Sequence, residues 1–134
     1  MRLHDWPERL SAAIAAAAGT PFDYGQHDCC LFAADCVLAV TGVDLAADWR
    51  GRYGTEASGL KLAKVRSVAQ LAGRYFQEVE PVFAHRGDLA VAPLGRRGRL
   101  ARVPLLFVVD GPLLRTYGAA AIPRVHATRA WRVE

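Results

Sequence analysis

The sequence predicts an α+β fold in which N-terminal helices pack on an antiparallel sheet. The chain has 134 residues, which is the size of one domain, and 52% of them are hydrophobic, which is enough to form a core. Apolar residues recur at helical spacing as far as Leu71 and alternate with polar residues from Tyr75 onward. Helices followed by closely spaced strands are typical of α+β domains. We therefore expect one domain over residues 1–134.

The first helix is predicted from its start and stop signals. Asp5 is placed to cap it, Pro7 lies in the first turn, and Glu8 completes a capping box three residues after Asp5. The alanine-rich helix should end at Gly19 and lead into a loop over residues 20–25.

A second helix is predicted over about residues 29–41, with Asp28 as its N-cap and Gly42 as its end. Six of its apolar residues recur at helical spacing, and most of the face they form should be core: Cys29, Phe32, Ala33, Cys36, Val37 and Val40.

An irregular segment and two further helices are predicted after the second helix. Residues 43–53 should be irregular, with a turn at residues 50–54. A third helix should run from Thr55-Glu56 to about Arg66, with Gly59 as a weak point, and a short fourth helix should occupy residues 68–71.

Five strands are expected after the helices. The alternating segments are residues 75–79, 88–92, 105–109, 113–117 and 130–133. Turns are predicted at Gly87, Gly95, Asp110-Gly111-Pro112 and Ile122-Pro123.

The cysteines and the N-terminus indicate where the protein is made. Cys29, Cys30 and Cys36 are an odd number within eight residues, and Cys29 and Cys36 lie two helical turns apart, so we expect reduced thiols. The longest apolar run, residues 12–18, is shorter than the roughly 20 residues of a membrane span. The N-terminus is acidic where a signal peptide is basic. We expect a soluble chain made in a cytoplasm without an export signal.

The formal charge of +4 is unevenly distributed. Residues 1–80 carry a net −2, and residues 81–134 carry +6 with arginine as their sole base. Four arginines between two predicted strands form either a solvated loop or a docking surface for an acidic protein or an anionic wall polymer: Arg96, Arg97, Arg99 and Arg102. No nucleic-acid-binding element accompanies them, so nucleic acid is not an expected partner.

The most informative stretch for function is the start of the second helix. If Asp28 caps this helix, Cys29 lies in the first turn, where unpaired backbone N–H groups and the helix dipole stabilise an anion. A thiolate is such an anion, so Cys29 is a candidate nucleophile. The alternative is that Cys29 is a small buried hydrophobic residue.

Three features in order resemble the NlpC/P60 superfamily of papain-like cysteine peptidases. They are Tyr24-Gly25 shortly before Asp28-Cys29, the helix that ends at Thr41-Gly42, and the segment Arg86-Gly87-Asp88-Leu89-Ala90-Val91. The resemblance covers about residues 20–115, and it implies an NlpC/P60 architecture with Cys29 in the nucleophile position. Cys30 stands where the family has serine, and we expect Cys30 to be structural and Cys36 to face the core.

A narrower likeness points to small phage-encoded proteins of this superfamily. It is carried by residues 27–35, by Arg50-Gly51-Arg52-Tyr53 and by Ala130-Trp131-Arg132-Val133. This likeness implies a tail-tip or tail-assembly protein of the virion tail, made in the cytoplasm of the host bacterium. Its implied partners are other phage tail proteins.

The family's base is a histidine at the start of the strand after Gly-Asp-Leu, and alignment on the closing Gly111 places Val103 there. His27 and His126 are the substitutes to consider, although His27 is placed to bond its own loop and His126 to lie at the surface. A zinc site from His27 and the cysteines is not expected, because adjacent cysteines diverge on a helix and no second ligand pair exists.

We therefore expect a structural or binding tail protein with a degenerate active site and no cofactor. The alternative is a peptidoglycan endopeptidase in which Cys29 attacks, with His27 or His126 as the base.

Overall fold

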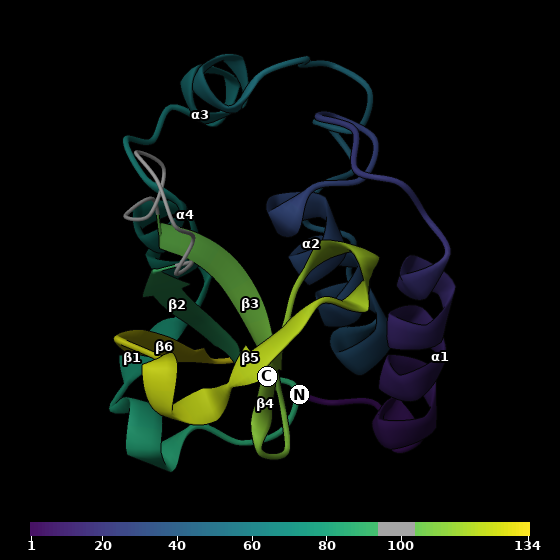
Figure 1. Ribbon diagram of the computed structural model, residues 1–134, viewed down its shortest axis with the longest axis vertical. Helices are drawn as coiled ribbons and strands as arrows, with labels where there is room; N and C mark the ends of the chain where they lie inside the picture. The colour runs from purple at the N-terminus through teal and green to yellow at the C-terminus, as the bar shows by residue number, and fades with distance from the viewer. Residues whose placement is uncertain (94–103) are drawn as a thin grey trace.

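Helices precede strands along the chain, as predicted, in the computed structural model, which describes residues 1–93 and 104–134 (Figure 1). The described residues form four α-helices and a six-stranded sheet in which all neighbouring strands are antiparallel. The predicted α+β class is confirmed.

The first helix, α1 (Trp6–Ala18), lies beside α2 (Cys29–Thr41). The capping box predicted for α1 is wrong, because the Asp5 side chain accepts no capping hydrogen bond. The backbone of Asp5 has φ −101° and ψ 22°, which is not the extended conformation that turns an N-cap side chain back toward the helix.

The second helix, α2, confirms its predicted bounds and both of its caps. Asp28 is extended and its Oδ1 accepts a hydrogen bond from the backbone N–H of Leu31 at 2.9 Å. Gly42 ends the helix with a φ of +81°, which glycine adopts without strain. The helix is buried on more than its predicted face: Leu31, Phe32, Ala33, Ala34, Cys36, Val37, Ala39 and Val40 are all buried. It is the central helix of the core.

The next two helices differ from the prediction at their ends. Helix α3 (Glu56–Ala63) stops before Arg66, because Lys64 adopts a left-handed conformation with φ 58°. Helix α4 (Val68–Tyr75) is longer than predicted, so the first strand begins at Gln77 rather than Tyr75. None of the helices in the described ranges has the length and apolarity to cross a bilayer.

Helix α3 runs without interruption through Gly59, the predicted weak point. A Cβ atom at this position would lie 2.8 Å from Cδ2 of the Tyr53 ring. The glycine therefore allows α3 to pack directly on that ring.

The sheet has the strand order β1-β6-β2-β3-β4-β5. Its strands are β1 (Gln77–Val79), β2 (Leu89–Pro93), β3 (Pro104–Asp110), β4 (Leu113–Arg115), β5 (Ala121–Pro123) and β6 (Arg129–Arg132). The turn predicted at Ile122-Pro123 is wrong, because both residues belong to β5, where Ile122 pairs with Leu114 of β4. Strand β5 is at the sheet edge, where a terminal proline is tolerated. Strand β4 ends at Arg115, before a 3₁₀ turn, η2 (Tyr117–Ala119). The predicted turn at Gly95 lies outside the described residues.

The two faces of the sheet carry separate apolar clusters. Alternation along β2 turns Leu89 and Val91 toward the helices, where they join Phe32, Val37 and Trp131 in the main core. The opposite face holds a smaller cluster: Ala84, Ala90, Ala92, Phe107, Val109, Leu114 and Ala130. The sheet is therefore buried on both faces, with the helical layer on one of them.

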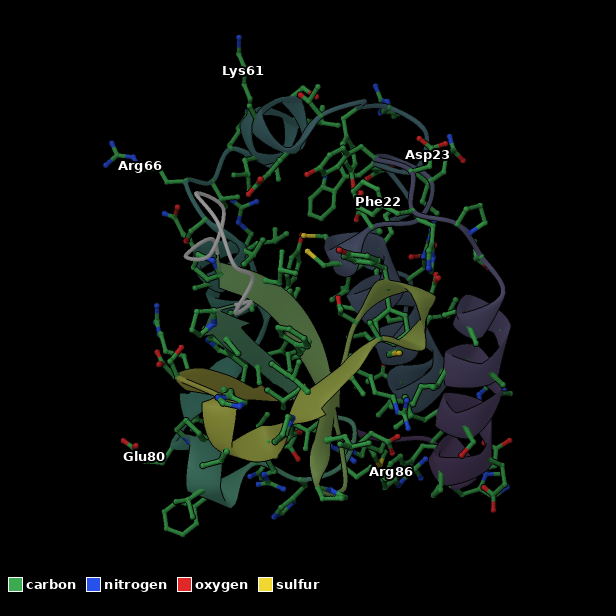
Figure 2. All side chains as sticks on the ribbon, viewed as in Figure 1. Phe22, Asp23, Lys61, Arg66, Glu80 and Arg86 are labelled. Carbon is green, nitrogen blue, oxygen red and sulfur yellow. The ribbon has the colours of Figure 1, made fainter. Side chains whose placement is uncertain are left out.

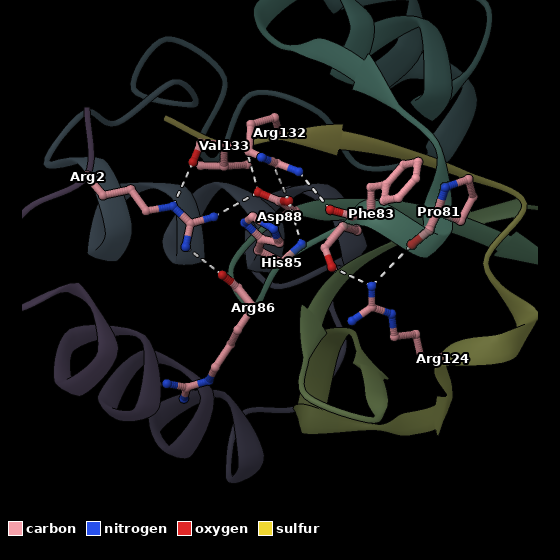
Figure 3. A network of polar contacts seen from close by, with 10 residues as sticks. Arg2, Pro81, Phe83, His85, Arg86, Asp88, Arg124, Arg132 and Val133 are labelled. Carbon is pink, nitrogen blue, oxygen red and sulfur yellow. Dashed lines mark hydrogen bonds and ion pairs between the residues drawn. The ribbon is translucent and has the colours of Figure 1, made fainter.

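Both ends of the chain are fixed by one buried carboxylate, that of Asp88 (Figure 3). Its Oδ1 accepts hydrogen bonds from Arg2 at 2.8 Å and from the backbone N–H of Val133 at 2.9 Å. Its Oδ2 accepts from Arg132 at 2.9 Å and from the backbone N–H of His85 at 2.7 Å. Four donors around one carboxylate join the start of β2 to both termini.

Replacing Asp88 should therefore be strongly destabilising. In Asp88→Ala two partly buried arginines lose their shared acceptor, and we expect the free energy of unfolding to fall by about 3–5 kcal/mol in urea titrations. Glu78→Ala is the matched control, because it removes a carboxylate whose ion pair with Arg129 is exposed, and it should change stability little. Equal losses in the two variants would contradict the assigned role of Asp88.

Candidate functional site

A pocket of about 110 Å³ opens between the start of α2, helices α3 and α4, and the start of β3. We call it the Cys29 pocket. Apolar side chains form most of its wall, and they come from all of these elements: Leu31, Trp49, Leu60, Ala63, Val68, Leu71, Pro104 and Leu105. Its polar and aromatic lining comprises Phe22, Tyr24, Asp28, Cys29, Cys30, Tyr53, Glu56 and Tyr117.

The carboxylate of Asp28 connects the three segments that meet beside the pocket. Its Oδ1 caps α2 through Leu31, and its Oδ2 accepts from the backbone N–H of Gly25 at 3.0 Å and from the hydroxyl of Tyr53. Asp28 is 3% exposed. The preceding loop, the helix start and residues 44–54 are therefore held by one side chain.

Gly25 is required for this arrangement. Its φ is +83°, and a Cβ atom there would lie 2.0 Å from the carbonyl oxygen of Tyr53. The carbonyl of Gly25 in turn accepts from the N–H of Gly51 at 2.7 Å. The glycine in the Tyr24-Gly25 motif thus allows the two loops to make direct backbone contact.

Cys29 lies in the first turn of α2, as predicted, and lines the pocket. Hydrogen bonding with the adjacent Cys30 thiol and with the backbone of Leu106 on β3 lowers the pKa of Cys29, while burial and the charges of Asp28 and Glu56 oppose this. The same interaction with Cys29, together with burial, raises the pKa of Cys30 well above its usual value. Cys36 is buried in the main core, and burial raises its pKa. All three cysteines are free, as predicted.

Cys30 lines the pocket beside Cys29, and its structural role stays a prediction. The expectation that Cys36 faces the core is confirmed.

The candidate bases do not meet Cys29 in the pocket. His27 is buried in a turn closed by paired backbone hydrogen bonds with Asp23, and its Nε2 accepts from the N–H of Gly118 at 3.0 Å. His126 is exposed in a 3₁₀ turn, η3 (Arg124–His126). The chain has four histidines, all within the described ranges, and none of them lines the pocket.

Val103, the residue aligned with the family's histidine, lies outside the described residues, as do Arg96, Arg97, Arg99 and Arg102. The adjoining residues Pro104 and Leu105 line the pocket, and neither side chain can accept a proton. Within the described ranges no group of three or more histidine, cysteine or acidic residues is arranged to hold a metal ion.

Sequence reasoning did not identify Tyr53, Glu56, Phe22 or Tyr117 as site residues. Tyr53 entered the sequence analysis only as the last residue of the motif Arg50-Gly51-Arg52-Tyr53. Its hydrogen bond to Asp28 spans 25 positions in the chain, and no local pattern reveals such a contact. The remaining three lie in loops or at a helix start, where periodicity carries no information about a distant pocket.

The comparisons with known proteins identify a family without an assigned role. A family model described as "Domain of unknown function (DUF6950)" matches residues 1–133, and the chain belongs to this family. Neither the curated proteins nor the solved structures contain a match.

The Tyr53 hydroxyl should stabilise the site. Tyr53→Phe removes a hydrogen bond to a buried carboxylate, and we expect the free energy of unfolding to fall by about 1.5–3 kcal/mol. Tyr75→Phe is the control, because the structure gives the hydroxyl of Tyr75 no hydrogen bond among the described residues, and its stability should stay near that of the wild type. Thermal and urea unfolding of both variants provide the measurement.

Alkylation should distinguish Cys29 from the other thiols. Its pKa is lowered, so its thiolate forms at lower pH than that of an ordinary cysteine, and iodoacetamide should modify it first while Cys36 stays protected. Cys30→Ala removes a donor to the sulfur and should move the pH–rate profile of Cys29 to higher pH, whereas Cys30→Ser should largely preserve it. Peptide mapping by mass spectrometry measures each site. A profile unchanged by Cys30→Ala would contradict the assigned thiol contact.

Proposed function

We propose that this member of the DUF6950 family is a bacteriophage tail protein, of the tail tip or of tail assembly, whose NlpC/P60-like scaffold binds a partner rather than cutting it. The observation that carries the proposal is a retained thiol without a proton acceptor. Cys29 occupies the start of α2 and lines the pocket, while none of the four histidines of the chain is among the lining residues.

Three local features support the NlpC/P60-like scaffold. The helix that begins with Cys29 packs on β3 of an antiparallel sheet. The Tyr24-Gly25 motif bonds to the Asp28 cap, and the Gly87-Asp88-Leu89 motif leads into β2 with Gly87 at φ +91°. All three features on which the resemblance rests therefore have a structural role, either beside the pocket or at the start of β2.

The absence of a base from the pocket favours binding over cleavage. A cysteine peptidase requires a group that accepts the thiol proton and later protonates the leaving amine. Here no histidine is among the lining residues, and the carboxylate of the adjacent Asp28 is already engaged by three donors. Loss of the base removes about 10²–10⁴-fold of rate.

One observation favours the enzymatic alternative, a peptidoglycan endopeptidase. The Cys29 pKa is lowered, which favours the nucleophilic thiolate form. Such an enzyme would need another proton donor for the leaving amine.

Incubation with purified peptidoglycan separates the two functions. We expect no muropeptide release from the wild type or from Cys29→Ala, as measured by chromatography of the soluble fraction. Release that disappears in Cys29→Ala and persists in Cys30→Ser would overturn the binding proposal and establish the peptidase.

The tail assignment has its own test in a phage or inducible prophage that carries the gene. Deletion should yield particles with missing or incomplete tail tips in electron micrographs. Complementation with Cys29→Ala should restore them as well as the wild type does. Normal tails after deletion would contradict a tail role.

A further inference from the structure

The floor and the mouth of the Cys29 pocket differ in chemistry. Its inner wall is aliphatic, with Leu60, Val68 and Leu71 among its residues. We call its solvent-exposed end the mouth, and this end is aromatic, because Phe22 is 46% exposed and Tyr24 is also exposed. The ring centroid of Phe22 lies 4.7 Å from that of Tyr24 and 4.9 Å from that of Tyr117.

The charged groups of the pocket are acidic. Among the described residues that line it, Asp28 and Glu56 carry the charges, and no lysine, arginine or histidine balances them. Three donors engage Asp28, whereas Glu56 is exposed and makes no ion pair within the described ranges. After burial, Glu56 is the next largest cause of the raised pKa of Tyr24, so its charge acts at the aromatic mouth.

The backbone at Glu56 is fixed by the cap of its helix. It is the first residue of α3, and the preceding Thr55 exchanges hydrogen bonds with Ser58 in a capping box. The ring of Tyr53 packs against Gly59 one turn later. The carboxylate therefore extends from an anchored helix start.

We propose that the Cys29 pocket binds a ligand that carries an ammonium group on a short apolar body. This inference rests on the proposed binding function and names the class of ligand that is bound. The body would lie against the aliphatic wall, with the ammonium group near Glu56 and the faces of the aromatic rings. Since a cavity of roughly 150 Å³ holds benzene, a pocket of about 110 Å³ suits a body of about four or five carbons.

A matched series of small molecules tests the charge preference. The probes n-butylamine, 1-butanol and butyrate share one apolar body and carry a cationic, a neutral and an anionic head at neutral pH. In NMR titrations of the full chain we expect butylamine to bind about tenfold more tightly than butanol, and butyrate to bind most weakly.

Two variants identify the groups responsible. Glu56→Gln keeps the shape and removes the charge, and it should bring butylamine to within about twofold of butanol. Glu80→Gln removes an equal charge at the opposite end of the molecule and should leave the preference intact (Figure 2). Phe22→Leu should weaken butylamine about threefold and leave butanol unchanged, if the ring faces hold the cation.

The inference fails if none of the three probes saturates, if butyrate binds most tightly, or if Glu56→Gln and Glu80→Gln behave alike. The titration uses neither peptidoglycan nor tail proteins, so its failure leaves the proposed function standing. Conversely, cleavage of peptidoglycan would overturn the proposed function without altering the ammonium preference.

Discussion

The structure around the candidate site depends on the buried carboxylate of Asp28. It caps α2 through Leu31 and binds Gly25 and Tyr53, so a helix start and two loops share one acceptor. An unpaired buried carboxylate is costly, and three donors offset that cost only in this geometry. Because Cys29 follows Asp28 directly, fixing the carboxylate also fixes the thiol at the edge of the pocket.

A second buried carboxylate has the same role at the other end of the domain. Asp88 binds Arg2, Arg132 and the backbone of Val133, and it joins the chain termini to the start of β2. Asp88 joins the start of β2 to the chain termini, and Asp28 joins the loops beside the pocket to the start of α2. A small domain thereby positions loops that its apolar core alone would not fix.

The sequence was sufficient where a local rule decides the structure. The caps of α2, the α+β order and the positions of five strands follow from Asp28, Gly42 and the change of period. It failed where partners are distant. Proline favours turns, so Ile122-Pro123 indicated a turn, whereas the pair belongs to an edge strand. Gly59 indicated a weak point in the helix, and the Tyr53 ring that packs on it comes from another segment. For the same reason the place of Cys29 at a helix start could be predicted, whereas the aromatic and acidic residues around it could not.

The central claim is that Cys29 has no imidazole partner. The most direct test is a long-range ¹H–¹⁵N spectrum of the histidine rings in the wild type and in Cys29→Ala near neutral pH. We predict that every imidazolium signal in the wild-type spectrum is also present in the spectrum of the variant. An imidazolium resonance that depends on the Cys29 thiol would reveal a thiolate–imidazolium pair and contradict the account.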